Sequence, residues 1–101
     1  MDELAFDAAM LCIYVRARDE VGYNATRYLQ MLHDHRGMET ARMLINATQP
    51  SEGYTALWER GRLDLTVEAL VLQSEWQALF AQEPELLERA RGRLADYGYN
   101  G

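Results

Sequence analysis

The stretch from Pro50 to Glu68 constrains the fold of this chain more than any other, because it holds two helix starts and one helix end. It contains Pro50 and two of the seven glycines. The hydroxyl of Ser51 can accept a hydrogen bond from the first turn of a helix. Gly61 can adopt the left-handed conformation in which many helices end. The stretch therefore predicts a short helix from Ser51 to Gly61 and a second one that begins at Thr66.

Trp58 lies in the middle of the first of these helices. Tyr54, Leu57 and Trp58 fall on one face at helical spacing. We therefore predict that Trp58 belongs to the hydrophobic core. The residues Leu63 to Leu65 alternate between apolar and polar, which predicts a short extended link before the next helix.

Apolar residues at helical spacing predict further helices on both sides of this stretch. The predicted helices cover Glu3 to Glu20, Ala25 to His35, Met38 to Ala47, Val67 to Phe80 with a break near Gln73, and a last helix with Pro84 in its first turn. Asn24 is expected to cap the second helix, Gly37 to end it, and Gly98 to end the last one. The buried stripe of the last helix is expected to contain Leu87, Ala90, Leu94 and Tyr97.

The predicted fold is all-α, a compact orthogonal array of five to six short helices around a central N-terminal helix. A chain of 101 residues is the size of one domain, so residues 1–101 are expected to fold as a unit. The tail, residues 99–101, is expected to be frayed.

The first helix is apolar on most sides, and its orientation is inferred from residue size. Ala5, Ala9 and Cys12 are small, so a neighbouring helix could approach closely there. We expect this face to be buried and Cys12 to be an inert core thiol. The opposite stripe is a candidate interaction surface made of Met10, Tyr14 and Arg18.

Composition argues against several functional classes. The net charge is −6, which disfavours a dedicated nucleic-acid binder and a protein that binds anionic membranes. All ten basic residues are arginine, which we interpret as the codon bias of a GC-rich bacterium. The single cysteine and the acidic start of the chain predict a cytoplasmic protein.

No residue pattern predicts catalysis, a metal site or a cofactor. His33 and His35 are two positions apart, so on a helix they point in different directions and cannot hold one ion together. Asp64 and Glu68 could lie one turn apart, but no second catalytic feature accompanies them.

Two groups of polar residues are candidate binding sites. The first is a polar cluster made of Asn24, Arg27, Arg62, Asp64 and Glu68. The second is an anion patch made of Arg89 and Arg93, which are neighbours on a helix at a spacing of four residues. The alternative for the second group is ordinary surface ion pairing, because Glu85 precedes Arg89 by four residues.

Residues 24–47 could form a helix-turn-helix, because two predicted helices flank Gly37. The second of these helices offers one arginine and one glutamate for contact with nucleic acid. Phosphate contacts supply most of the affinity for DNA. Two ordinary packed helices are therefore the favoured interpretation of this segment.

Four stretches together resemble a small bacterial domain family of unassigned function. They are Gly22–Tyr28, Pro50–Trp58, Gly61–Glu68 and Arg91–Tyr99. Domains of this family occur alone and also appended to larger proteins, including nuclease-like ones. The resemblance implies an accessory or adaptor module and identifies no catalytic residue.

The predicted function is protein–protein interaction or self-association, by a module without chemistry of its own. Six tyrosines are more than one small core needs, and tyrosine is common in interfaces. One alternative is a nucleic-acid-associated module that uses residues 24–47. Another is a small-ligand binder or enzyme with a pocket near Trp58.

Overall fold

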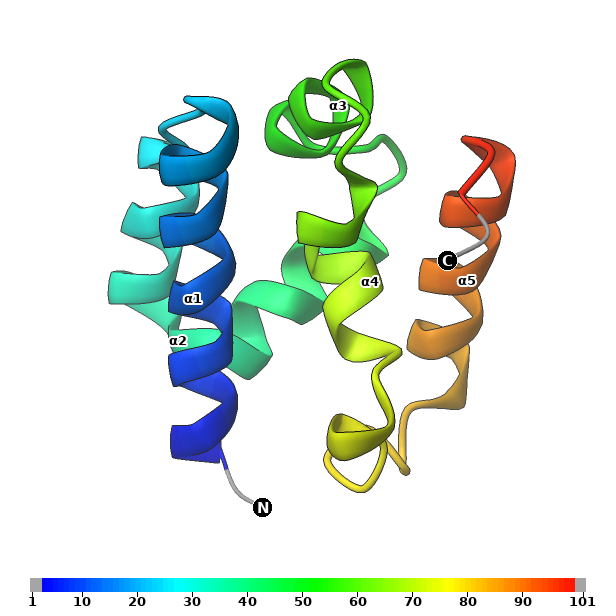
Figure 1. Cartoon of the computed structure of the whole chain (residues 1–101). Coiled ribbons are helices and arrows are strands. Elements are labelled where there is room, and N and C mark those ends of the chain that lie inside the picture. The colour runs from blue at the N-terminus through cyan, green and yellow to red at the C-terminus, as the bar shows by residue number, and fades with distance from the viewer. Residues whose placement is uncertain (1–2, 100–101) are drawn as a thin grey trace.

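The computed structural model describes residues 3–99, and all regular structure in this range is helical. In chain order the elements are α1 (Glu3–Val21), α2 (Thr26–Asn46), α3 (Glu52–Glu59), η1 (Leu63–Leu65), α4 (Val67–Val71), η2 (Ser74–Trp76) and α5 (Pro84–Asp96) (Figure 1). The two η elements are single 3-10 turns. The prediction of a compact all-α fold is confirmed, although α1 and α2 are longer than expected, with 19 and 21 residues. Within residues 3–99, no helix is long and apolar enough to cross a membrane.

The main hydrophobic core joins α1, α2, α4, η2 and α5. Three aromatic rings stand at its centre. Phe6 meets both Trp76 and Phe80 edge-on, with 5.3 Å between ring centroids in each pair. This edge-to-face arrangement places the positive edge of one ring against the negative face of another. Phe6 therefore ties the start of α1 to the chain segment that leads into α5.

Helix α1 lies at one side of the molecule, packed along the first half of α2 (Figure 1). Its buried residues all fall on one face: Phe6, Met10, Ile13, Tyr14 and Ala17. The helix enclosed on most sides is α4, in which four of five residues are buried. The prediction that the N-terminal helix occupies the centre was therefore wrong, because burial on one face places α1 at the edge of the core.

Helix α2 is broken near its middle, at the position predicted from Gly37. The residue with unusual backbone angles is its neighbour Arg36, with φ 66° and ψ −178°. The Asp7 carboxylate accepts hydrogen bonds from the Gly37 N–H at 2.7 Å and from the Arg36 guanidinium at 2.7 Å. A Cβ atom at Gly37 would lie 2.7 Å from Asp7 Oδ1 and 3.1 Å from the Phe6 ring. Gly37 therefore permits the close approach of α1, and Asp7 caps the second half of α2.

Most of the predicted helix ends are confirmed. The hydroxyls of Ser51 and Thr66 each accept a hydrogen bond from the backbone N–H three residues later, at 3.0 and 3.2 Å. Gly61 and Gly98 have φ values of 70° and 81°, as left-handed helix ends require. Pro84 is in the first turn of α5, where its missing N–H is harmless.

Two local predictions were wrong. The backbone of Ala25, not Asn24, precedes α2, and its side chain makes no capping hydrogen bond. The Asn24 side chain instead accepts a hydrogen bond from the Tyr14 hydroxyl at 2.6 Å. Leu63–Leu65 is a 3-10 turn rather than an extended link, because both leucines turn inward and are buried. The predicted frayed tail lies outside the described residues apart from Tyr99, which is half-buried.

Candidate functional site

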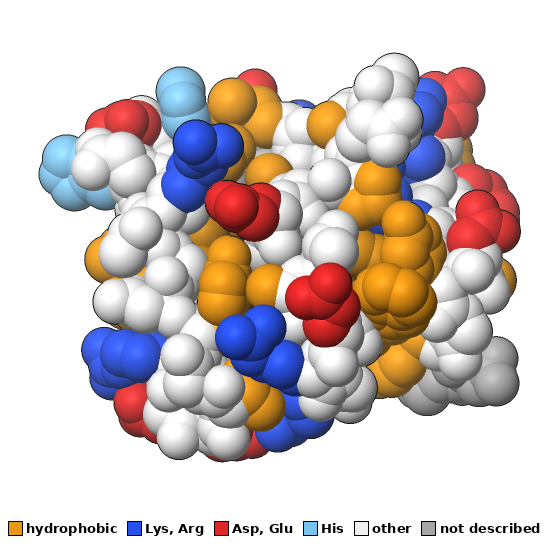
Figure 2. All heavy atoms as spheres, turned by 90° about the horizontal axis from the view of Figure 1, so that it is seen from above, with side chains coloured by type: hydrophobic (Ala, Val, Ile, Leu, Met, Phe, Trp, Pro, Cys, Tyr) orange, Lys and Arg blue, Asp and Glu red, His pale blue; other side chains and the backbone are white. Residues whose placement is uncertain are grey.

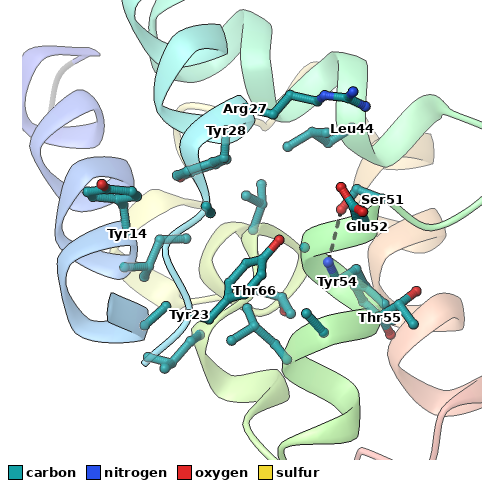
Figure 3. Close-up of a pocket in the computed structure, with 18 of the residues that line it drawn as sticks. Tyr14, Tyr23, Arg27, Tyr28, Leu44, Ser51, Glu52, Tyr54, Thr55 and Thr66 are labelled. Carbon is teal, nitrogen blue, oxygen red and sulfur yellow. Dashed lines mark hydrogen bonds between the residues drawn. The ribbon is translucent and has the colours of Figure 1, made fainter. Parts of the chain in front are cut away.

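A groove of about 740 Å³ opens between the α1–α2 corner and helix α3. The C-terminal half of α1, both ends of α2, most of α3 and the start of α4 contribute to its walls (Figure 3). Figure 2 shows the molecule from above, with hydrophobic side chains visible between polar and charged ones. The volume is in the range of pockets that bind small molecules.

Tyrosine rings form much of the wall, and most of their hydroxyls are held by the protein. Tyr14 donates to Asn24, Tyr28 donates to the Met10 carbonyl at 2.8 Å, and Tyr54 donates to the Arg93 carbonyl at 3.1 Å. Burial raises the pKa of Tyr28 and of Tyr54. These rings are therefore fixed, neutral parts of the wall.

Tyr23 differs from the other wall tyrosines, because its hydroxyl has no hydrogen-bond partner within residues 3–99. Its ring projects into the groove (Figure 3). The guanidinium of Arg60 lies over this ring, 5.3 Å from its centroid. The hydroxyl would lie 3.7 Å from a Cβ atom on Gly53, so it reaches across to α3. Burial is the main cause that raises the pKa of Tyr23, and the Glu52 charge adds to it.

The buried carboxylate of Glu68 lies in the floor of the groove and forms an ion pair with Arg93 of α5. Arg93 Nη1 donates to Glu68 at 2.9 Å, and the exposed fractions of the two side chains are 10% and 4%. Arg93 also donates to the carbonyls of Leu44 and Ala47. Burial raises the pKa of Glu68, and Arg93 opposes this rise. The pair therefore fixes α2, α4 and α5 together beneath the groove.

A second candidate surface is the outer face of α1, which we define as Leu4, Ala8, Leu11, Cys12 and Val15. Val15 is half-buried and the other four are exposed, with Leu4 at 72% and Leu11 at 46%. These residues lie on the side of α1 opposite to its buried face. An exposed apolar stripe of this kind is typical of a contact surface.

The predicted interaction surface of Met10, Tyr14 and Arg18 needs a correction. Met10 and Tyr14 are buried, at 0% and 8% exposure, and only Arg18 is at the surface. Cys12, predicted to be a core thiol, is exposed. The two faces of α1 were assigned the wrong way round, because Phe6, Met10 and Tyr14 pack inward and the small residues Ala5, Ala8 and Cys12 point outward.

The predicted polar cluster is divided between two places. Asn24, Arg27 and Glu68 line the groove. Arg62 lies outside it and bridges two carboxylates, with Asp64 at 3.0 Å and Glu20 at 2.8 Å. Arg62 lowers the pKa of Asp64, and it joins Arg16 in lowering the pKa of Glu20 to about 2. This second group is a surface ion-pair network that ties the end of α1 to η1.

The predicted anion patch does not form, because Arg93 turns inward to Glu68 while Arg89 remains exposed on α5. Trp58, predicted to be in the core, is 45% exposed and meets Tyr97 edge-on at 5.3 Å. The core tryptophan is Trp76. The tyrosines lie partly at the surface, as expected: four of the six are half-buried, and only Tyr14 and Tyr54 are buried.

The remaining candidates from the sequence are either exposed at the surface or already paired with other residues of the protein. His33 and His35 are exposed, and no group of three potential metal ligands occurs within residues 3–99. Residues 24–47, the possible helix-turn-helix, lie mainly in the kinked helix α2. Its second half contains Arg42, which pairs with Glu83 at 2.9 Å.

Sequence reasoning missed the outer face of α1 and the roles of Tyr23 and Glu52. The outer face had a readable signal, because Leu4, Ala8, Leu11 and Val15 follow one another at spacings of four, three and four residues. Tyr23 and Glu52 are far apart in the sequence, and only the fold brings them to one groove.

No family model, curated protein or solved structure matches this chain. Residues of the groove come from three of the stretches that resemble a bacterial domain family, namely Gly22–Tyr28, Pro50–Trp58 and Gly61–Glu68. The membership of that family stays a prediction.

Proposed function

We propose that this chain is a small protein–protein interaction module without chemistry of its own, and that it pairs with a second copy through the outer face of α1. The observation that carries the proposal is the exposed apolar stripe on that face, in which Leu4 is 72% exposed. Exposed apolar stripes favour association, because burial removes apolar surface from water.

The spacing of the outer face suits a helical partner. Leu4, Ala8, Leu11 and Val15 fall at the alternating positions of a heptad repeat, which keep one face of a helix against another helix. Ala8 and the flanking Cys12 are small, so two helices can approach closely along this line. A second copy of α1 presents the same complementary pattern, as a two-fold interface requires.

Charge favours an antiparallel arrangement of the two copies. Glu3 stands at the start of α1, and Arg16 and Arg18 stand near its end. Antiparallel pairing places Glu3 of one helix beside Arg16 and Arg18 of the other. Arg16 and Arg18 now make exposed local ion pairs with Glu20 and Asp19, which are weak and can exchange partners. The helix dipoles also oppose one another favourably in this arrangement.

The expected dimer is weak, because the apolar contact is short. From Leu4 to Val15 a helix rises about 17 Å. So short a contact buries less than the roughly 1,600 Å² of a standard interface, and we expect a dissociation constant on the order of 10⁻⁵ M.

Sedimentation analysis over a range of protein concentrations tests the proposal. The wild-type chain should shift from monomer to dimer, and Leu11→Asp should remain monomeric because the new charge would be buried in the interface. Met43→Asp is the matched control, since Met43 is similarly exposed at 41% but lies on α2. A wild-type chain that is monomeric at all concentrations, or equal effects of both variants, would contradict the proposal.

The single cysteine gives an independent test without any substitution. Cys12 is exposed in the free chain and flanks the proposed contact. Its reaction rate with a thiol reagent should therefore fall as protein concentration rises and the dimer forms. In Leu11→Asp the rate should be independent of concentration. A wild-type rate that does not depend on concentration would place Cys12 outside any interface.

A further inference from the structure

The arginines of this chain are almost all paired, and one of the exceptions lies on the groove. Within residues 3–99, each arginine other than Arg27 and Arg89 has a hydrogen bond to a carboxylate or a carbonyl. Arg27 stands in the first turn of α2 and lines the groove, whereas Arg89 lies on α5 away from it. Arg27 is thus a free cation beside a mainly apolar cavity.

Glu52 brings a free anion to the same groove from helix α3. It stands in the first turn of α3, and no ion pair or hydrogen bond joins its carboxylate to another described residue. Figure 3 shows the Arg27 side chain above Leu44, with Glu52 and Ser51 on the α3 side. A ligand with a single charge would be attracted by one of these groups and repelled by the other.

We propose that the groove binds a zwitterionic ligand with an apolar side chain, namely a free amino acid or a short peptide. Its carboxylate would lie on Arg27 and its ammonium group on Glu52, so both charges of the groove would be matched. This site is distinct from the outer face of α1, and the proposal does not depend on self-association.

Tyr23 supplies a third polar group to the groove. Its hydroxyl has no partner within residues 3–99 and reaches toward Gly53, next to Glu52. Because burial and the Glu52 charge raise its pKa, the hydroxyl stays protonated and can donate to a carboxylate. The other wall tyrosines cannot do this, since their hydroxyls already donate to protein atoms.

The interior of the groove suits an apolar side chain. Ile13, Leu44 and Val67 line it, together with the tyrosine rings. The carboxylate in its floor, Glu68, is held by Arg93 and does not compete with Glu52 for the ammonium group. The volume of about 740 Å³ leaves room for a large aromatic or aliphatic side chain and for a second residue.

Three related probes test the charge requirement by NMR titration of the ¹⁵N-labelled chain. L-Phenylalanine carries both charges, L-phenylalaninamide lacks the carboxylate, and 3-phenylpropionate lacks the ammonium group. L-Phenylalanine should shift the amide signals of groove residues, and each of the other two should bind about tenfold more weakly, as expected for the loss of a charge-assisted hydrogen bond. The dipeptide Phe-Phe distinguishes the sources, since tighter binding than phenylalanine indicates a peptide.

Two substitutions assign the charges to residues. Arg27→Gln should weaken binding of L-phenylalanine about tenfold but should not weaken binding of phenylalaninamide, which has no carboxylate. Glu52→Gln should likewise weaken binding of L-phenylalanine but not that of 3-phenylpropionate, which has no ammonium group. Both side chains are exposed, so the variants should fold normally. Arg89→Gln is the control for removal of an unpaired arginine elsewhere, and it should leave all affinities unchanged.

The proposal is overturned if neither L-phenylalanine nor Phe-Phe shifts the groove signals at millimolar concentration. It is also overturned if the three phenyl probes bind equally, or if Arg27→Gln and Arg89→Gln have the same effect. The titrations are repeated on Leu11→Asp, which should bind as the wild type does. Failure in the groove would then be separate from any failure of self-association.

Discussion

The two faces of α1 carry similar numbers of apolar residues and have opposite environments. The inner face, with Phe6, Met10 and Ile13, is buried in the main core. The outer face, with Leu4, Ala8 and Leu11, is exposed. Large side chains dominate the inner face, because burying a large side chain removes more apolar surface from water. The number of apolar residues therefore does not separate the two faces; their packing partners do.

The same contrast between inside and outside recurs in two pairs of identical residues. Trp76 is 7% exposed and packs on Phe6, whereas Trp58 is 45% exposed. Arg93 is enclosed with Glu68, whereas Arg89, one helical turn earlier, is exposed. Residue type alone therefore does not decide which member of each pair contributes more to the stability of the fold. The less buried member of each pair can serve as the control for the more buried one.

The largest effect is expected from placing a charge on the buried face of α1. Met10→Asp should unfold the domain, because Met10 is fully buried and an unpaired buried charge is strongly destabilising. Cys12→Asp, two positions away on the exposed face, should leave the melting temperature nearly unchanged. Thermal unfolding followed by circular dichroism measures both. Stable folding of Met10→Asp would show that the inner face of α1 was assigned wrongly.

Removal of the buried arginine should cost about 3–5 kcal/mol, because it leaves Glu68 without its partner. Arg93→Met tests this by chemical denaturation, with Arg89→Met as the exposed control. The control should change stability by less than about 0.5 kcal/mol. Similar losses in both variants would mean that the pair with Glu68 does not hold α4 and α5 together.

The loss in Arg93→Met should depend on pH through Glu68. The folded-state pKa of Glu68 is above its ordinary value, because burial outweighs the effect of Arg93. A group with a raised folded-state pKa favours folding at acid pH, and this contribution falls as pH rises through that pKa. Without Arg93 the pKa rises further, so the loss relative to wild type should be smaller near pH 5 than at pH 7. A pH-independent difference would contradict this account.

Substitution of the two tryptophans by alanine should reduce the stability of the fold by different amounts. Trp76→Ala should cost about 3–5 kcal/mol, as for other large aromatic residues in cores. Trp58→Ala should cost about 1 kcal/mol, mainly from the lost edge contact with Tyr97. Urea denaturation measures both variants under the same conditions. A larger loss of unfolding free energy in Trp58→Ala than in Trp76→Ala would mean that Trp58, and not Trp76, belongs to the core.

The smallest effects are expected at two glycines within helical segments. Gly37→Ala should cost about 1–3 kcal/mol, because its Cβ atom would crowd Asp7 and Phe6 on α1. Gly92→Ala should instead stabilise the chain by up to about 1 kcal/mol, since nothing lies within 4 Å of a Cβ atom there and alanine is the better helix former. Opposite signs in these unfolding experiments would support the close contact of α1 with α2. A stabilising Gly37→Ala would argue against it.

Local sequence determined the helix ends and the class of the fold. The caps at Ser51 and Thr66 and the stops at Gly61 and Gly98 were predictable, because each depends on one side chain and its own backbone. Pro84 marked the start of α5 for the same reason. The exception is Asn24, whose side chain is taken by Tyr14 from a different helix.

Only the tertiary structure decided which face of each helix is buried and which polar groups meet. Helix α1 is apolar on nearly all sides, so its periodicity could not distinguish Met10 from Cys12, and packing against Trp76, Phe80 and α2 settled it. The groove residues Tyr23, Arg27 and Glu52 come from different elements, and the pairing of Arg93 with Glu68 spans 25 residues. Such contacts depend on how whole helices pack, which the spacing of residues along one helix does not specify.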